Sequence, residues 1–174
     1  MLFSLQERTL KKLINNYNYN IFGSKVRLKI GDKAPSFSLI DQNGDIRTLN
    51  KVKKPLVLFF YPKDDTPGCT IEACGFRDKY DLFKILGAEV WGISNGSIQS
   101  HLEFANKNKL QYPLLCDQNN ILRNQFGVPK KLGFIEGRVT YIINSEGVIK
   151  HIFEALLNGP AHIKEAIKAL KKLQ

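Results

Sequence analysis

The chain has 174 residues, of which 43% are hydrophobic and 24% are charged, a composition typical of one globular domain. No apolar run approaches the ~20 residues that a membrane-spanning helix needs, so we expect no membrane association. The formal net charge is +10, but most of the surplus lies in residues 1–33 and 150–174, which favours a solvated basic surface over a specific nucleic-acid partner.

Residues 1–25 are predicted to be an extension, and residues 26–174 the folded domain. The extension contains a leucine-rich stretch, an Asn/Tyr tract and a single acid, Glu7. It lacks the compact apolar segment of a secretory signal. Two locations therefore stay open: a cytoplasmic protein whose extension has no targeting role, or a plastid or other organelle with residues 1–25 as the targeting segment.

The domain begins with a predicted β-hairpin, whose strands at 37–40 and 46–49 flank the turn sequence Asp41-Gln42-Asn43-Gly44. The next element is the apolar run 55–61, which is typical of a central strand buried on both faces. A helix is predicted from about residue 67 to residue 86, because an apolar stripe at helical spacing continues through this range.

The rest of the chain alternates between strands and helices. We expect strands at 89–94 and 112–115, helices at 97–108 and 120–126, a second hairpin at 139–143 and 148–153, and a last helix from Pro160. This order predicts an α/β domain with a central mixed sheet and helices on both faces.

The cysteine content favours a reducing compartment. The three cysteines, Cys69, Cys74 and Cys116, are odd in number and irregularly spaced, unlike the paired cysteines of a secreted disulfide framework. The histidines lie far from them in sequence, so no zinc-binding spacing is present. We therefore predict reactive thiols, no metal and no cofactor.

Cys69 is the strongest candidate for a reactive residue. It falls in the first turn of the predicted helix, just after the buried strand, where unpaired backbone N–H groups stabilise a thiolate. Thr66, three residues earlier, suits the N-cap, and its hydroxyl can reach the sulfur or a bound oxygen. Pro62 would shield the thiolate and fix the loop, while Pro67 and Gly68 let the backbone approach a substrate closely.

These residues also carry a resemblance to a known family. Pro62-x-x-x-Thr66-x-x-Cys69 resembles the peroxiredoxin active-site motif, and Glu72-Ala73-Cys74 resembles the branch of bacterioferritin comigratory protein and peroxiredoxin Q. The resemblance extends over roughly residues 27–172, including the stretch Gly137-Arg138-Val139-Thr140-Tyr141.

The resemblance implies a thioredoxin-like fold and a peroxidase that reduces hydrogen peroxide and organic hydroperoxides in antioxidant defence and redox homeostasis. Cys69 would be the peroxidatic residue, Cys74 the resolving residue, Thr66 a hydrogen-bonding partner and Arg138 the guanidinium facing the sulfur. A thioredoxin-like dithiol would recycle the disulfide, in a monomer or a weak homodimer.

Helix geometry constrains the step that joins the two cysteines. At ~1.5 Å and ~100° per residue, the Cα atoms of Cys69 and Cys74 lie roughly 8–9 Å apart in a regular helix. A disulfide needs a Cα separation below about 7 Å. We therefore predict that the first turn unwinds in each cycle, helped by Gly68 and Gly75.

We expect structural roles for Cys116 and for the other polar residues near the motif. We expect Cys116 to be a small buried residue at a strand end, the aspartates of the 63–68 loop to be solvated, and Glu72 to be a polar group that orients the helix. Two alternatives to the peroxidase stay open: a disulfide oxidoreductase, although C-x-x-C is absent, and a basic binding module that keeps the fold without the chemistry.

Overall fold

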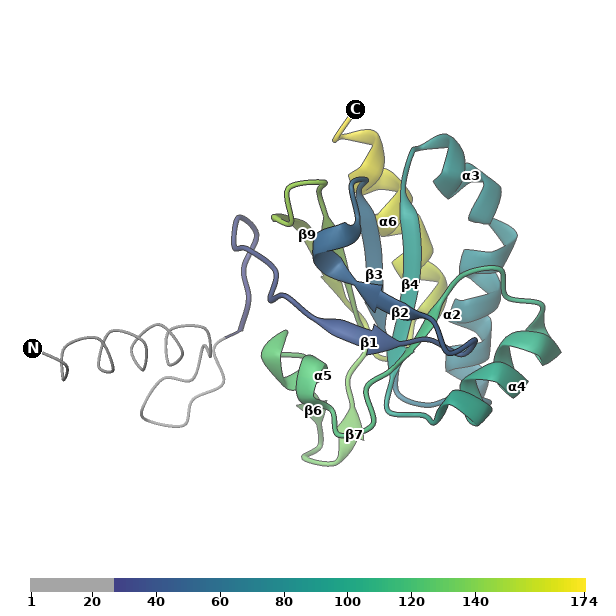
Figure 1. The fold of residues 1–174 in the computed structure, drawn as a ribbon. Helices are drawn as coiled ribbons and strands as arrows, with labels where there is room; N and C mark the ends of the chain where they lie inside the picture. Colours follow the sequence, from purple (N-terminus) through teal and green to yellow (C-terminus); the bar gives the residue numbers. More distant parts are fainter. Residues whose placement is uncertain (1–26) are drawn as a thin grey trace, which may run out of the picture.

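The computed structural model describes residues 27–174 (Figure 1), so the predicted extension 1–25 lies outside the described residues. A five-stranded sheet forms the centre of the domain. Its strands, in spatial order, are β5 (Leu114–Cys116), β4 (Glu89–Ser94), β3 (Leu56–Phe60), β8 (Val139–Ile143) and β9 (Ile149–Glu154). Strands β3, β4 and β5 are parallel, whereas β8 is antiparallel to both β3 and β9. The predicted mixed sheet is confirmed.

Helices and short hairpins cover the two faces of this sheet. The helices are α2 (Pro67–Asp78), α3 (Tyr80–Ile85), α4 (Ile98–Asn108), α5 (Ile121–Gln125) and α6 (Gly159–Lys171), with a 3-10 turn η1 at Leu49–Lys51. The hairpins are β1–β2 (Ser38–Ile40 and Ile46–Thr48) and β6–β7 (Lys130–Lys131 and Ile135–Glu136). In Figure 1, the β1–β2 hairpin crosses in front of the sheet, with α2 and α6 behind it.

Strand β3 divides the hydrophobic core in two, because alternate side chains of a strand point to opposite faces. Val57 and Phe59 join the core beneath α2, α3, α4 and α6. Leu56, Leu58 and Phe60 join the other core, which packs against α5 and the segments around β1 and η1. All five side chains are at most 1% exposed, so the continuous apolar run is explained by burial on both faces.

The predicted long helix over residues 67–86 is wrong in one respect. Lys79, with φ −106° and ψ 10°, separates it into α2 and α3. The apolar stripe could not reveal the break, because Phe76 and Phe83 on either side of it pack into the same core. The β6–β7 hairpin was not predicted, since its strands are two residues long and carry two lysines.

The helices of the described domain are short. Within residues 27–174, no helix is long and apolar enough to cross a membrane. The same residues contain no group of three or more His, Cys, Asp or Glu side chains arranged to hold a metal ion.

Candidate active site

Cys69 lies in the first turn of α2, which follows β3 after the loop 61–66. Pro67 is the first helical residue, and the Thr66 carbonyl accepts the first helical hydrogen bond, from the Thr70 amide at 2.9 Å. The Cys69 side chain is 1% exposed, and its thiol is free. The sulfur is therefore held in a dry site next to the unpaired N–H groups of a helix start.

Arg138 supplies a positive charge to this sulfur. Its Nη2 lies 3.4 Å from Cys69 Sγ, its Nη1 donates to Glu72 Oε2, and its Nε donates to the Leu156 carbonyl at 3.1 Å. Arg138 directly precedes β8, and the pairing of Val139 with Phe60 brings it to the end of β3. Sheet register thus joins two residues that are far apart in sequence.

Glu72 is a buried member of the site, and the role predicted for it, a polar group that orients the helix, does not include its contact with Arg138. The side chain is fully buried and forms an ion pair with Arg138. Burial raises the pKa of Glu72 to about 7, although the charge of Arg138 opposes this effect. The spacing of three residues from Cys69 was an available signal, because residues i and i+3 share a helix face.

A second layer of buried polar groups lies against Glu72. His162, from α6, is fully buried, with Nδ1 at 3.5 Å from Glu72 Oε1 and at 2.8 Å from Thr140 Oγ1. Its Nε2 lies 2.9 Å from the Ala155 carbonyl oxygen. Burial lowers the pKa of His162 to about 4. The sequence offers no local signal for the position of this histidine.

The structure places Thr66 and Pro62 in the loop before Cys69. The Thr66 hydroxyl donates to the Lys63 carbonyl at 3.1 Å, and in this state neither caps the helix nor bonds to the sulfur. Thr66 therefore holds the N-cap position through its backbone alone, whereas we expected a side-chain cap. Pro62 is half-buried and directly follows Tyr61.

Cys74 lies on the same helix as Cys69 but faces another element. Its thiol donates to Asn108 Oδ1, at the end of α4, at 3.7 Å. Arg77 donates to the Asn108 carbonyl at 2.7 Å and so fixes this junction. Because both cysteines are free within one unbroken helix, Cys74 must change its surroundings before its sulfur can reach Cys69.

The prediction that the 63–68 loop aspartates are solvated is wrong for Asp64, which is 6% exposed. Its carboxylate accepts hydrogen bonds from the Tyr61 hydroxyl at 2.7 Å and the Ser100 hydroxyl at 2.6 Å, and lies 2.7 Å from His101 Nδ1. Burial acts to raise the pKa of Asp64, but these partners outweigh it and lower the pKa. The network ties the active-site loop to α4.

Arg123 is a buried residue for which we predict no role from the sequence. It donates to the carbonyl oxygens of Tyr61 at 2.6 Å and Gly137 at 2.7 Å, and so connects the end of β3 to the residue before Arg138. Its side chain is the largest of those that are fully buried. No local pattern in the sequence distinguishes it from a surface arginine of a short helix.

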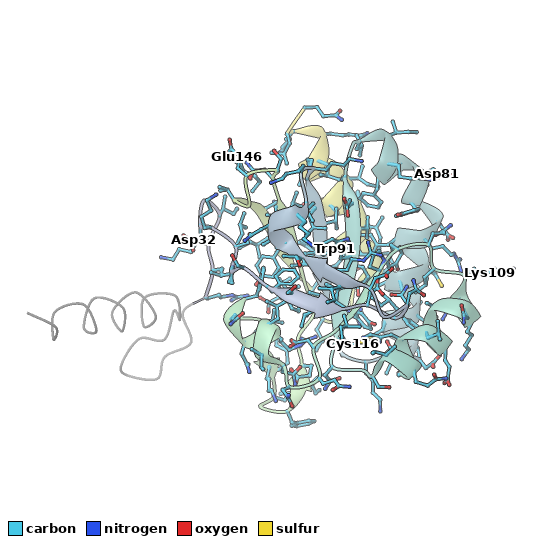
Figure 2. All side chains as sticks on the ribbon, in the orientation of Figure 1. Asp32, Asp81, Trp91, Lys109, Cys116 and Glu146 are labelled. Atoms are coloured by element: carbon cyan, nitrogen blue, oxygen red, sulfur yellow. The ribbon has the colours of Figure 1, made fainter. Side chains whose placement is uncertain are left out.

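Cys116 lies apart from this cluster, at the end of β5. Figure 2 labels it at the lower end of the sheet. The residue is at the strand end, as predicted, but its side chain is half-buried where we expected a buried one. Burial, with smaller effects of Asp64 and Asp41, raises the pKa of its thiol to about 11. This thiol is protonated near neutral pH and is a poor nucleophile.

Solved structures share this fold. Peroxidoxin BcpB from Mycobacterium tuberculosis matches with a TM-score of 0.79 and 35% identity, covering 85% of this chain and 99% of that one. Bacterioferritin comigratory protein from Xanthomonas campestris matches with a TM-score of 0.74 and 29% identity, covering 79% and 91%. The fold and the site define a thiol peroxidase of the peroxiredoxin class.

Proteins with similar sequences show to which branch of the peroxiredoxin class the chain belongs. Chloroplastic peroxiredoxin Q of Arabidopsis thaliana is 50% identical over 143 residues, 81% of this chain and 66% of that protein. Chloroplastic peroxiredoxin Q of Sedum lineare is 46% identical over 146 residues, which cover 83% of this chain and 78% of that protein. The AhpC/TSA family model matches residues 30–152. The chain belongs to the AhpC/TSA family, in its peroxiredoxin Q branch, and is an enzyme that reduces peroxides with a cysteine.

Proposed function

We propose that Cys69 is the residue that attacks peroxide and that Cys74 resolves the product. The observation that supports this most strongly is the 3.4 Å contact between Arg138 Nη2 and the buried Cys69 sulfur. The other two thiols have different surroundings: Cys74 donates to an amide oxygen, and Cys116 is near two carboxylates.

In the first step, the electron pair of the Cys69 thiolate forms a bond to one peroxide oxygen. The O–O bond breaks, and its electron pair leaves with the other oxygen, which takes a proton to become water or an alcohol. Arg138 faces the line along which negative charge moves, so it stabilises the transition state more than the ground state. Thr66 completes this environment if its hydroxyl turns from the Lys63 carbonyl to the bound peroxide, and Pro62 limits the access of water.

In the second step, the Cys74 thiolate attacks the sulfenic sulfur of Cys69. A disulfide forms as the S–O bond breaks, and the sulfenic oxygen leaves as hydroxide, which takes a proton from solvent to become water. Because Cys74 faces Asn108 on α4, we propose that the first turns of α2 unwind before this step.

The disulfide requires two electrons from an outside donor to complete the cycle. We propose a thioredoxin-like dithiol, which attacks the disulfide through a mixed-disulfide intermediate. Organic hydroperoxides are proposed substrates beside hydrogen peroxide, and this agrees with the alkyl peroxide reduction named for the Xanthomonas campestris protein. We propose a monomer or weak homodimer as the working form, to be measured by sedimentation with reduced and oxidised protein.

Three matched cysteine variants test the proposal in a stopped-flow peroxide assay. We expect Cys69→Ser to be inactive, and Cys74→Ser to consume one peroxide equivalent and then stop unless an external thiol is added. Cys116→Ser is the control and should turn over like the wild type. An active Cys69→Ser variant would contradict the assignment.

A plastid location is proposed for the protein in preference to the cytoplasm. It is supported by the plant relatives, several of which are named chloroplastic peroxiredoxin Q. Expression of the full chain with a C-terminal fluorescent tag, next to a form that starts at residue 27, tests this. Loss of organelle fluorescence in the shorter form is expected, and identical distributions would contradict the proposal.

A further inference from the structure

A buried carboxyl–imidazole pair lies next to Arg138. Glu72 and His162 are both fully buried, and Glu72 Oε1 lies 3.5 Å from His162 Nδ1. Arg138 binds the other carboxyl oxygen, and Oε1 has no hydrogen-bond partner among residues 27–174. An unpaired carboxylate oxygen in a dry interior is costly, so the protonation state of this pair needs a physical account.

The hydrogen bonds of His162 fix which of its nitrogens carries a hydrogen. Nε2 lies 2.9 Å from the Ala155 carbonyl oxygen, and a carbonyl only accepts, so Nε2 is protonated. Burial lowers the pKa of His162 to about 4, and this keeps the ring neutral near neutral pH. Nδ1 is therefore an acceptor, and its one lone pair is shared between the Thr140 hydroxyl, which donates to it at 2.8 Å, and any hydrogen on Glu72 Oε1 at 3.5 Å.

If Glu72 were ionised, two hydrogen-bond acceptors, Glu72 Oε1 and His162 Nδ1, would face each other with no hydrogen between them. A hydrogen on Oε1 turns this contact into an attractive one and leaves Oε2 free to accept from Arg138. The pKa of Glu72, raised to about 7 by burial, makes the neutral acid accessible. The other titratable groups that act on Glu72 and Arg138 are the Cys69 thiol and the buried Tyr112 phenol.

We propose that Glu72 stores a proton on Oε1, directed at His162 Nδ1, while Cys69 is a thiolate, and releases it when the sulfur becomes a neutral sulfenic acid. The inference rests on the proposed role of Cys69. Arg138 then faces one anion at each stage: the thiolate before the reaction and the Glu72 carboxylate after it. Loss of the sulfur's charge leaves the guanidinium to stabilise the carboxylate, so the Glu72 pKa falls.

The step balances in atoms and charge. The thiolate's electron pair forms the S–O bond, the O–O bond breaks, and the departing alkoxide or hydroxide gains one proton while Glu72 loses one. Cys69–S⁻ plus Glu72–COOH plus ROOH gives Cys69–SOH plus Glu72–COO⁻ plus ROH. The reduction of peroxide to the sulfenic stage therefore takes up no net proton from solvent.

Infrared difference spectroscopy tests the stored proton. In a Cys74→Ser background, which stops at the sulfenic stage, addition of peroxide should remove the carbonyl band of a protonated carboxylic acid and add carboxylate bands. Isotopically labelled glutamate should shift this band without any change in sequence. Glu72→Gln should abolish it, whereas Glu103→Gln, an exposed acid on α4, should leave it unchanged.

Proton uptake from a weakly buffered, slightly acid solution gives a second measure. In the Cys74→Ser background we expect no uptake with Glu72 present, and one proton per peroxide with Glu72→Gln. His162→Leu removes the hydrogen-bond acceptor that faces Glu72 and should raise the uptake toward one proton per peroxide. His162→Asn puts an amide oxygen near the position that Nδ1 occupies in the wild type and should bring the uptake back toward zero.

The outcomes separate this inference from the proposed function. If peroxide does not oxidise Cys69, the proposed function fails. Two results would contradict the proton store while leaving the peroxidase role intact. In the first, Cys69 is oxidised but the carboxylic-acid band does not change. In the second, Cys69 is oxidised and the protein takes up the same number of protons with Glu72 as with the Glu72→Gln substitution. The labelled-glutamate experiment needs no Glu72 variant, so misfolding of Glu72→Gln does not prevent the test.

Discussion

The guanidinium of Arg138 is 3.4 Å from the sulfur of Cys69, although the residues come from different elements and are distant in sequence. Three directed contacts, to Cys69, Glu72 and the Leu156 carbonyl, hold the group in one orientation. A planar guanidinium makes these contacts through three separate nitrogens, whereas the ammonium of lysine has all its donors on one nitrogen and cannot reach the three partners in this arrangement.

We therefore predict that Arg138→Lys lowers the second-order rate of peroxide reduction by about 100-fold or more, the usual effect of removing one oriented donor to a transition state. Stopped-flow kinetics with the wild type measure it. Arg47→Lys is the matched control, since Arg47 pairs with Asp41 on the β1–β2 hairpin and should keep full activity. A fully active Arg138→Lys enzyme would contradict the role of the guanidinium.

Unwinding of α2 predicts a change in hydrogen exchange. In the reduced protein, Cys69 and Cys74 belong to one helix, and the Cys74 thiol donates a hydrogen bond to Asn108. Because a regular helix keeps the cysteines too far apart for a disulfide, the amides of residues 70–74 should lose protection in the oxidised protein. Exchange measured by mass spectrometry on both forms checks this, with α6 as the internal reference. Equal protection of α2 in the two forms would rule out the unwinding.

The buried pair of Glu72 and His162 predicts an unusual dependence of stability on pH. The pKa of Glu72 is raised from 4.5 to about 7 in the folded protein, so its contribution is present at low pH and is lost as pH rises through that window. The pKa of His162 is lowered from 6.5 to about 4, so its contribution is lost as pH falls through a similar window. In the wild type the two effects oppose each other.

Each single variant should expose the effect of the remaining residue. Glu72→Gln should become more stable as pH rises from 4 to 6.5, and His162→Asn less stable as pH rises from 4.5 to 7. Each change amounts to roughly 3 kcal/mol in the free energy of unfolding, from 1.36 kcal/mol per pKa unit. Urea denaturation at a series of pH values measures both slopes. Parallel pH profiles for the two variants would contradict the assigned protonation states.

Asp64 is predicted to be important for stability in spite of its position in a polar loop. Asp64→Ala leaves the Tyr61 hydroxyl and His101 without their buried partner, and loss of a buried polar partner costs about 1–3 kcal/mol, more for a charged one. Asp65→Ala is the control, because Asp65 is exposed and its ion pair is with the exposed Lys107. Thermal unfolding should separate the two variants, and equal melting temperatures would show that the Asp64 network is dispensable.

Sequence analysis predicted the elements that depend on local signals. The apolar run of β3 and the motif from Pro62 to Cys74 are continuous in sequence. Periodicity and turn chemistry therefore predicted the strand, the helix start and the placement of both cysteines on that helix. The mixed sheet and thioredoxin-like fold also agree with the structure and its relatives. The break at Lys79 escaped because apolar side chains continue at helical spacing on both sides.

The residues that were missed depend on partners distant in sequence. Asp64 looks like a solvated loop acid until α4 brings Ser100 and His101 to it. Glu72 looks like a helix-surface acid until β8 and α6 place Arg138 and His162 beside it. Burial of a charged group follows from its three-dimensional partners, and no local sequence pattern records them.

Cys69 is the sulfur that we propose peroxide oxidises. The most direct test of this proposal treats the Cys74→Ser protein with one equivalent of hydrogen peroxide in the presence of a sulfenic-acid trapping reagent and locates the adduct by peptide mass spectrometry. We predict one adduct on Cys69, with Cys116 unmodified, and a Cys69–Cys74 disulfide when the wild type is treated in the same way. An adduct on Cys116, with Cys69 unmodified, would contradict the account.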